Sequence, residues 1–208
     1  LTRSSAASDV YKRQVLSHLE YYLQIVWPEL NVNVVSTTEQ WAGAAIAGPK
    51  SRDMLAKLYP ELDVSNEALP FMGFKEADFN GIPSRIFRIS FSGELAYEIN
   101  VKSDHGMFMW EKMMDVGKEF GNQPYGTEAL STLRIEMGHV AGPELDGRTI
   151  PADVSLNGLV SKKKDFIGKN SLSREAFNLE DRQKIVGLIP TDRKSSIPEG
   201  SHIVLDKD

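Results

Sequence analysis

The sequence contains no cysteine, and this absence excludes several kinds of site at once. Without a thiol, the chain forms no disulfide, offers no thiolate nucleophile and holds no zinc–thiolate centre. A chain without cysteine is typical of a reducing compartment, so we expect a cytoplasmic protein. The four histidines are scattered, and no two of them have the spacing of metal ligands (His18, His105, His139 and His202). We therefore expect no metal site.

Long apolar runs and nucleotide-binding loops are missing as well. No run approaches the roughly 20 apolar residues that a helix needs to cross a bilayer. No strand is followed by G-x-G-x-x-G, and neither G-x-x-x-x-G-K nor G-x-S-x-G occurs. Acidic residues outnumber basic residues by 29 to 24, for a net charge of −5. Such a chain has no electrostatic attraction to nucleic acid or to an anionic membrane, so we expect neither as a partner.

The chain is long enough to bury a core, with 208 residues of which 41% are hydrophobic. Its first residues, LTRSSAASDVYKRQ, are polar, and their end resembles a translated sequencing adapter. We interpret residues 1–14 as a non-native segment and read both ends as truncations. The composition changes near Leu179–Lys184. We therefore predict one domain over residues 15–180 and the start of a second, β-rich domain over residues 181–208.

Helix and strand signals alternate without a strict βαβ order, which predicts the α+β class. The expected helices are Leu16–Val26, a helix opened by Gly48-Pro49 and stopped by Pro60, His105–Phe120, Thr127–Met137 and Asp165–Arg174. The expected strands are Asn33–Thr37, a buried Trp41–Ala47, Phe74–Phe79, Ile82–Phe91, Ala96–Val101, Ile185–Ile189 and Ile203–Leu205. Asn80-Gly81 predicts a tight hairpin because both residues tolerate a positive φ. Gly138 is expected to end the fourth helix as a left-handed cap.

One strand carries the most informative polar residue. Alternation along Gly93–Val101 puts Tyr97, Ile99 and Val101 on one face and Glu98 on the other, where its neighbours are small or short. A carboxylate there could accept the paired N–H donors of a pterin ring, as it does from arginine. The alternative is a solvent-facing glutamate, and the pattern alone favours this alternative.

Two other charged features have simpler interpretations. Lys162-Lys163-Lys164 could meet a polyglutamate tail or an acidic partner, but a solvated turn is the more frequent explanation of such a run. Arg134 and Glu136 on the expected fourth helix could pair with each other or with neighbouring charges. We expect them to be structural. From its residues alone, the chain is an α+β domain without a diagnosed activity.

Four stretches together resemble the glycine-cleavage T-protein (aminomethyltransferase) family, and they follow in the family's order and spacing. They are Trp41–Leu55 (WAGAAIAGPKSRDML), Phe91–Ile99 (FSGELAYEI), Tyr125–Gly138 (YGTEALSTLRIEMG) and Lys162–Leu172 (KKKDFIGKNSL). Within this family, the segments PYGTEALSTLRIEMGHVAGPELDGRTIPAD and VSKKKDFIGK look most like the alpha subunits of heterotetrameric sarcosine oxidases. The resemblance extends over nearly all of Val15 to Asp208.

The resemblance implies a folate-binding domain followed by the start of a small β-barrel. It also implies that Glu98 holds the pterin of tetrahydrofolate, with Tyr97 and Gly93 of the same motif in supporting roles. By the same resemblance, the enzyme demethylates sarcosine oxidatively to glycine, yielding methylenetetrahydrofolate or formaldehyde. Flavin and NAD would belong to other parts of the enzyme or to its partner subunits. The chain alone would then be inactive.

Two departures from the family pattern matter. Leu130 stands where T-proteins have a folate-binding arginine, which argues against a true aminomethyltransferase and leaves recognition of the glutamyl tail open. The family's catalytic aspartate belongs to a segment upstream of Val15, so we assign no catalytic residue. The alternatives are a glycine-cleavage aminomethyltransferase, a dimethylglycine-type oxidase or dehydrogenase domain, and a non-catalytic interaction module with a vestigial folate pocket.

Overall fold

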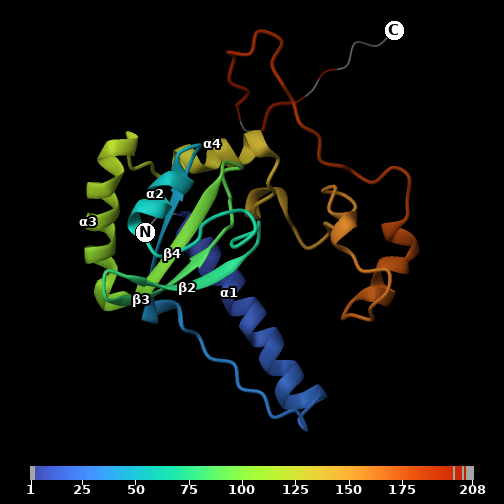
Figure 1. Cartoon of the computed structure of the whole chain (residues 1–208). Coiled ribbons are helices and arrows are strands. Elements are labelled where there is room, and N and C mark those ends of the chain that lie inside the picture. Colours follow the sequence, from blue (N-terminus) through green and yellow to red (C-terminus); the bar gives the residue numbers. More distant parts are fainter. Residues whose placement is uncertain (1–2, 199, 203, 205–208) are drawn as a thin grey trace. The chain divides into compact units, whose positions relative to one another are not determined.

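The computed structural model describes residues 3–198, 200–202 and 204, which form two compact units. The first unit ends at His139 and the second begins at Val140. The first contains four strands in one antiparallel sheet of order β1-β4-β3-β2, together with the longer helices (Figure 1). This confirms the α+β class. The predicted division near residue 180 lies within the second unit and stays a prediction about domains.

The elements of the first unit are joined by connections of unequal length, the longest of which covers residues 59–73. The helices are α1 (Arg3–Tyr21), which continues into a π-helical turn (Tyr22–Val26), α2 (Ser51–Leu58), α3 (Gly106–Gly117) and α4 (Thr127–Met137). The strands are β1 (Trp41–Ala47), β2 (Phe74–Phe79), β3 (Ile82–Phe87) and β4 (Ala96–Lys102). Three 3-10 turns complete the unit at Thr38–Gln40, Ser103–His105 and Lys118–Phe120.

One face of the sheet is covered by α2 and α3, and the core lies between these layers. The sheet contributes Ile46, Phe79, Ile86, Tyr97, Ile99 and Val101, whereas the helices contribute Met54, Leu55, Leu58, Met109 and Met113. The apolar residues of both helices recur every three or four positions, so each helix buries one stripe. Met109 and Met113 of α3 therefore pack in the core, whereas Met107 at the start of this helix is exposed.

Two turns follow the predicted chemistry closely. Asn80 and Gly81 join β2 to β3 with φ of 53° and 87°, so the hairpin is confirmed. Gly138 caps α4 with φ of 77°, and its amide and that of His139 donate to the last carbonyls of the helix. A left-handed residue at this position is what allows these two amides to turn back.

Two predicted strands do not form, and a third forms with a different burial than predicted. Asn33–Thr37 forms no strand, because no other segment of the described chain pairs with it. Ile185–Ile189 forms none either, and Ile203 and Leu205 lie outside the described residues. β1 forms as predicted but is not a buried strand. It lies at the edge of the sheet, and only Ile46 is fully buried.

The second unit is held by short turns and contains no strand among its described residues. Its 3-10 turns are Gly142–Glu144, Asn157–Leu159, Lys169–Ser173 and Glu175–Phe177. The predicted helix Asp165–Arg174 is therefore only a 3-10 turn. From residue 181 onward, the described residues contain no strand of the expected β-barrel, which would need several strands paired with one another.

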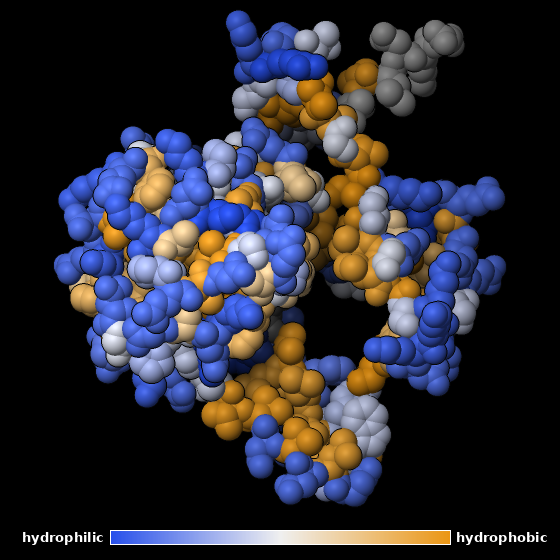
Figure 2. Space-filling view, viewed as in Figure 1, coloured by the Kyte–Doolittle hydropathy of each residue, from blue (hydrophilic) through white to orange (hydrophobic). Residues whose placement is uncertain are grey.

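Large apolar side chains gather on the surface of the end of α1 and the segment that follows it (Figure 2). Leu19, Ile25, Leu30, Val32 and Val35 are all exposed there. These side chains are not buried against the sheet. The hydrophobic effect therefore does not hold this segment in place as it holds the core.

Candidate functional site

β4 separates the predicted site residues between the two faces of the sheet. Tyr97, Ile99 and Val101 are completely buried and point to the side covered by α2 and α3. Glu98 and Asn100 alternate with them, are half-buried and lie on the opposite face. The face assignment predicted from the sequence is therefore confirmed. A central strand produces this outcome because its apolar positions fall at every second residue.

Glu98 lies in the middle of its face with an aromatic residue on one side and a small residue on the other. Its direct partners across the sheet are Phe87 on β3 and Ala45 on β1. Phe87 stacks on Phe74 of β2, with ring centroids 5.0 Å apart. No described residue donates a hydrogen bond to the Glu98 carboxylate or forms an ion pair with it. The carboxylate keeps its acceptor capacity for a ligand.

Small residues leave space beside this carboxylate. The β1 residues that share the face of Glu98 are Gly43, Ala45 and Ala47. On β4 itself, the residue before Glu98 on this face is Ala96. None of them carries a side chain longer than a methyl group. A planar ring can lie over such a floor and present its edge to Glu98, whereas longer side chains here would occupy that volume.

Tyr97 does not share the Glu98 face. Its ring is fully buried, the Arg52 guanidinium lies 5.9 Å from the ring centroid, and no described residue bonds to its hydroxyl. Burial raises the pKa of Tyr97, and the nearby Arg52 and Arg88 oppose this shift. A side chain in this position contacts the core rather than a ligand beside Glu98. Its supporting role would be to fix β4 from behind.

Gly93 lies in the loop that leads into β4, and two features require glycine there. Its φ is 83°, in the left-handed region that residues with a side chain rarely adopt. A Cβ would also lie 2.6 Å from Cγ and Sδ of Met137 at the end of α4. Gly93 therefore allows the loop to approach α4 closely, which is a structural contribution to the shape of this region.

A cavity of about 580 Å³ lies beside β1, between the start of α2, the end of α3 and the start of α4. Its wall includes Trp110, Phe120, Tyr125 and Leu130. Glu98 is not among its lining residues, but the small β1 residues Gly43, Ala45 and Ala47 beside Glu98 are. The departure at Leu130, which is half-buried, thus affects a cavity that includes this small-residue strand.

The other charged candidates are structural. Lys162, Lys163 and Lys164 are exposed in a turn where the last two amides donate to Ser161 Oγ, at 3.2 and 3.0 Å. Arg134 is buried, and it donates from Nη1 to the His139 carbonyl at 3.1 Å. These positions agree with the solvated-turn and structural interpretations of the sequence.

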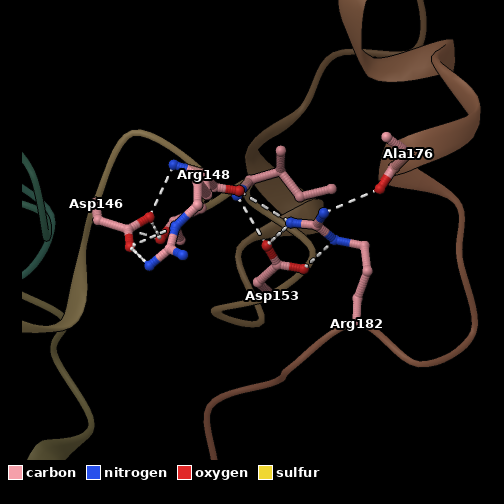
Figure 3. A network of polar contacts seen from close by, with 7 residues as sticks. Asp146, Arg148, Asp153, Ala176 and Arg182 are labelled. Atoms are coloured by element: carbon pink, nitrogen blue, oxygen red, sulfur yellow. Dashed lines mark hydrogen bonds and ion pairs between the residues drawn. The ribbon is translucent and has the colours of Figure 1, made fainter.

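Polar contacts concentrate around Asp153 and Arg182 in the second unit (Figure 3). Arg182 donates to both carboxylate oxygens of Asp153, with Nε–Oδ1 at 2.9 Å, and to the carbonyls of Arg148 and Ala176. The hydrogen bonds from Arg182 hold the pKa of Asp153 below its ordinary value. Because every oxygen of this carboxylate is already bonded, the pair anchors two chain segments and offers no free group for chemistry.

The described residues contain no group of three or more histidine and acidic side chains that could hold a metal ion. Among the same residues, no helix is both long and apolar enough to cross a membrane. His139 is occupied structurally: its Nδ1 lies 3.0 Å from the carbonyl of Phe91. The unpaired Glu98 face is therefore the strongest candidate for binding.

Comparison with known proteins decides the family. Residues 5–164 match the model of the GCVT N-terminal domain. The chain belongs to the GCVT N-terminal domain family. This membership covers the whole sheet, α2 to α4 and the part of the second unit up to Lys164. It supports the family resemblance drawn from the four sequence stretches.

Individual relatives of this GCVT domain include both oxidase subunits and transferases. The chain is 48% identical over 194 residues to the sarcosine oxidase subunit alpha of Corynebacterium sp. (strain P-1) and 45% identical over 197 residues to that of Rhizobium meliloti (strain 1021). These alignments cover 92% and 93% of the chain but 20% of each relative. The aminomethyltransferase of Bacillus subtilis (strain 168) is 37% identical over 161 residues, covering 76% of the chain and 44% of that protein. The chain thus spans about a fifth of the oxidase subunits it matches.

Two residues of the Glu98 face were not singled out in the sequence. Phe87 and Asn100 become neighbours of Glu98 only through the pairing of β3 with β4 and the alternation along β4. The alternation along β4 does place Asn100 on the Glu98 face from the sequence alone, but it assigns this residue no role. No sequence signal identifies Phe87, because the register between strands depends on the whole sheet.

Proposed function

We propose that the Glu98 face binds the pterin ring of tetrahydrofolate. The observation that carries this proposal is a half-buried carboxylate without a protein partner, flanked by Phe87 and by small residues of β1. A carboxylate accepts two parallel N–H donors well, and a pterin offers such a pair from its amino group and the adjacent ring nitrogen. The residues present therefore fit the ligand that the family resemblance implies.

Each residue of the motif has a distinct task in this proposal. Glu98 binds and orients the ring edge, and Phe87 offers an aromatic surface beside it. Tyr97 fixes β4 from the core, and Gly93 lets the preceding loop pack against α4. When bound, tetrahydrofolate supplies a nucleophilic nitrogen that captures a one-carbon unit. The protein's contribution is to hold this reactant in place, which converts a bimolecular step into an effectively unimolecular one.

The proposed reaction is the oxidative demethylation of sarcosine to glycine, with this chain as part of a sarcosine oxidase alpha subunit. The oxidation would belong to flavin and NAD sites in other parts of the enzyme or its partner subunits, so the chain alone would be inactive. Identities of 48% and 45% to such alpha subunits support this assignment. The partners would be the other subunits of a cytoplasmic hetero-oligomer.

An aminomethyltransferase is the second candidate, because the Bacillus subtilis enzyme of that name is 37% identical to the chain. Leu130 in place of the family arginine argues against it. The two candidates differ in their carbon donor. Sarcosine supplied with the flavin-containing subunits would support the oxidase, whereas an aminomethyl group on a lipoylated carrier would support the transferase.

The test of folate binding is the variant Glu98→Gln. The amide accepts only one hydrogen bond from the ring edge and carries no charge, so folate affinity should fall by about 1.5–3 kcal/mol. The measurement is a calorimetric titration with 5-formyltetrahydrofolate, a stable reduced folate. Glu94→Gln is the matched control, since Glu94 is an exposed glutamate of the same motif. Equal affinities of Glu98→Gln and the parent chain would refute the proposal.

A further inference from the structure

A single carboxylate can bind only part of the hydrogen-bonding edge of a pterin ring. Along this edge, the amino group and the ring N–H are followed by a carbonyl oxygen at C4, so two donors stand beside one acceptor. Glu98 can satisfy the two donors but repels the carbonyl, because an ionised carboxylate only accepts hydrogen bonds. A complete site therefore needs a donor next to Glu98 on the same face.

Asn100 supplies such a donor in the right place. It is two residues from Glu98 on β4, so the two side chains leave the same face about 7 Å apart at the backbone. Asn100 is half-buried, and its amide forms no hydrogen bond with any described residue. A side-chain amide donates two hydrogen bonds and can meet a carbonyl that its carboxylate neighbour cannot.

The surroundings of Asn100 fix its direction. On the neighbouring strand β1, the residue paired with Asn100 is Gly43. A Cβ at Gly43 would lie 2.7 Å from Asn100 Oδ1. The missing side chain at Gly43 therefore provides the room in which the Asn100 carboxamide lies. Arg85 on β3 pairs with Asn100 and stacks on Trp41 of β1 at 4.1 Å, so their contact spans β4 beside Asn100. Asn100 is thus confined between Gly43 and this cation–π pair.

We infer that Asn100 is a specificity-determining residue of the folate site, which donates to the C4 carbonyl of the pterin while Glu98 accepts from its two N–H groups. This inference rests on the proposed function and extends it. Glu98 and Asn100 together select a 4-oxo ring over a 4-amino ring, whose edge presents a donor where the carbonyl stood and lacks the ring N–H. Gly43 positions Asn100 for this contact.

Calorimetric titration of the chain with 5-formyltetrahydrofolate tests the contact. Asn100→Ala removes one hydrogen bond between neutral groups, so affinity should fall about tenfold. Asn100→Asp places a second carboxylate against the carbonyl and beside Glu98, and the loss should be larger. Lys102→Gln is the matched control, because Lys102 is an exposed polar residue of the same strand and face. It should bind like the parent chain.

A double-mutant cycle separates a contact with the ring from a structural effect. Gly43→Ala should weaken binding by a similar factor, because the new methyl group displaces the Asn100 amide. If Gly43 acts only through Asn100, then Gly43→Ala has no further effect in the Asn100→Ala background. Additive losses would show that Gly43 contributes to the site independently of Asn100 and would overturn its positioning role.

Ligand selectivity provides a readout that a merely structural role would leave unchanged. The parent chain should prefer tetrahydrofolate to its 4-amino counterpart, tetrahydroaminopterin, and Asn100→Asp should shift this ratio towards the 4-amino ring. An unchanged ratio, or an Asn100→Ala variant that binds like the parent while Glu98→Gln loses affinity, would overturn the role of Asn100 alone. A parent chain that binds no folate would overturn the proposed function, and the inference with it.

Discussion

The two units of the chain owe their cohesion to different contacts. The first unit buries a continuous core between its sheet and two helices, with Leu55, Tyr97 and Ile99 completely inaccessible to solvent. In the second, Val154 is the one large apolar side chain that is buried among the described residues, and the Asp153–Arg182 pair joins distant segments instead. Burial of aliphatic side chains does not depend on pH between the acid and neutral ranges, whereas a carboxylate pair depends on ionisation. The units should therefore fail under different conditions.

The largest expected effect is on the core of the first unit. Leu55→Ala removes a completely buried side chain and leaves a cavity, so the free energy of unfolding should fall by roughly 2–5 kcal/mol. Chemical denaturation monitored by circular dichroism measures the change. The same substitution at Leu179, which is 51% exposed in the second unit, should cost less than about 0.5 kcal/mol. Equal costs at both positions would remove the contrast between the units.

Alkaline pH should weaken the first unit through Tyr59. Burial raises the pKa of Tyr59 to about 12, against the bond from its hydroxyl to Ser84 at 2.9 Å. Because the unfolded state ionises first, the stabilising contribution is complete below pH 10 and is lost as the pH rises towards 12. The total loss is about 2–3 kcal/mol. Between pH 8 and 12, the free energy of unfolding from chemical denaturation should decrease less for Tyr59→Phe than for the parent chain. An equal decrease in parent and variant would exclude Tyr59 as the cause.

A smaller loss of stability is expected from a substitution at Gly93. Alanine there must adopt a left-handed φ of 83° and displace Met137, so the variant should lose roughly 1–2 kcal/mol of stability. The loop before β4 should move with it, which weakens folate binding as well. Gly147→Ala is the control, because Gly147 lies in the second unit with no atom near the added Cβ. A Gly93→Ala chain of unchanged stability would disprove the close-packing role.

Substitution of Arg182 should have the smallest effect on global unfolding. It also tests most directly whether the two units are stabilised by different contacts. Arg182→Gln should leave the unfolding of the first unit unchanged but expose amides near residues 146–153 to hydrogen exchange. Arg148→Gln should change little, since the Arg148 side chain is 91% exposed. Mass spectrometry of exchanged peptides measures both. Protection lost equally in the two units would contradict their independence.

Acid should act on the second unit in the same way as this substitution. Hydrogen bonds from Arg182 lower the pKa of Asp153 from its ordinary 3.8. The contact is therefore complete above that pH and is lost as the pH falls through the lower value in the folded state. Exchange near Asp153 should rise below about pH 4, before the core of the first unit opens. Simultaneous opening of both units would contradict this order.

Local signals predicted those parts of the fold that depend on local chemistry. Asn80-Gly81, α4 with Gly138, and the alternation around Glu98 follow from φ preferences and periodicity, which neighbouring residues decide. Asn33–Thr37 and Ile185–Ile189 have strand composition but form no strands. Their composition meets the side-chain requirement of a strand, but hydrogen-bonding partners come only from other segments.

The features of the candidate site also divide into those set by local sequence and those set by tertiary structure. The sequence by itself determined that Glu98 and Tyr97 point to opposite faces, since a strand alternates, and it determined the family through four short stretches. Only the tertiary structure decided that β1 is an edge strand, that Phe87 flanks Glu98, and that Gly43 makes room for Asn100. The physical reason is strand register: the choice of partner residue depends on the turns, core and neighbouring strands together, and no single segment carries that information.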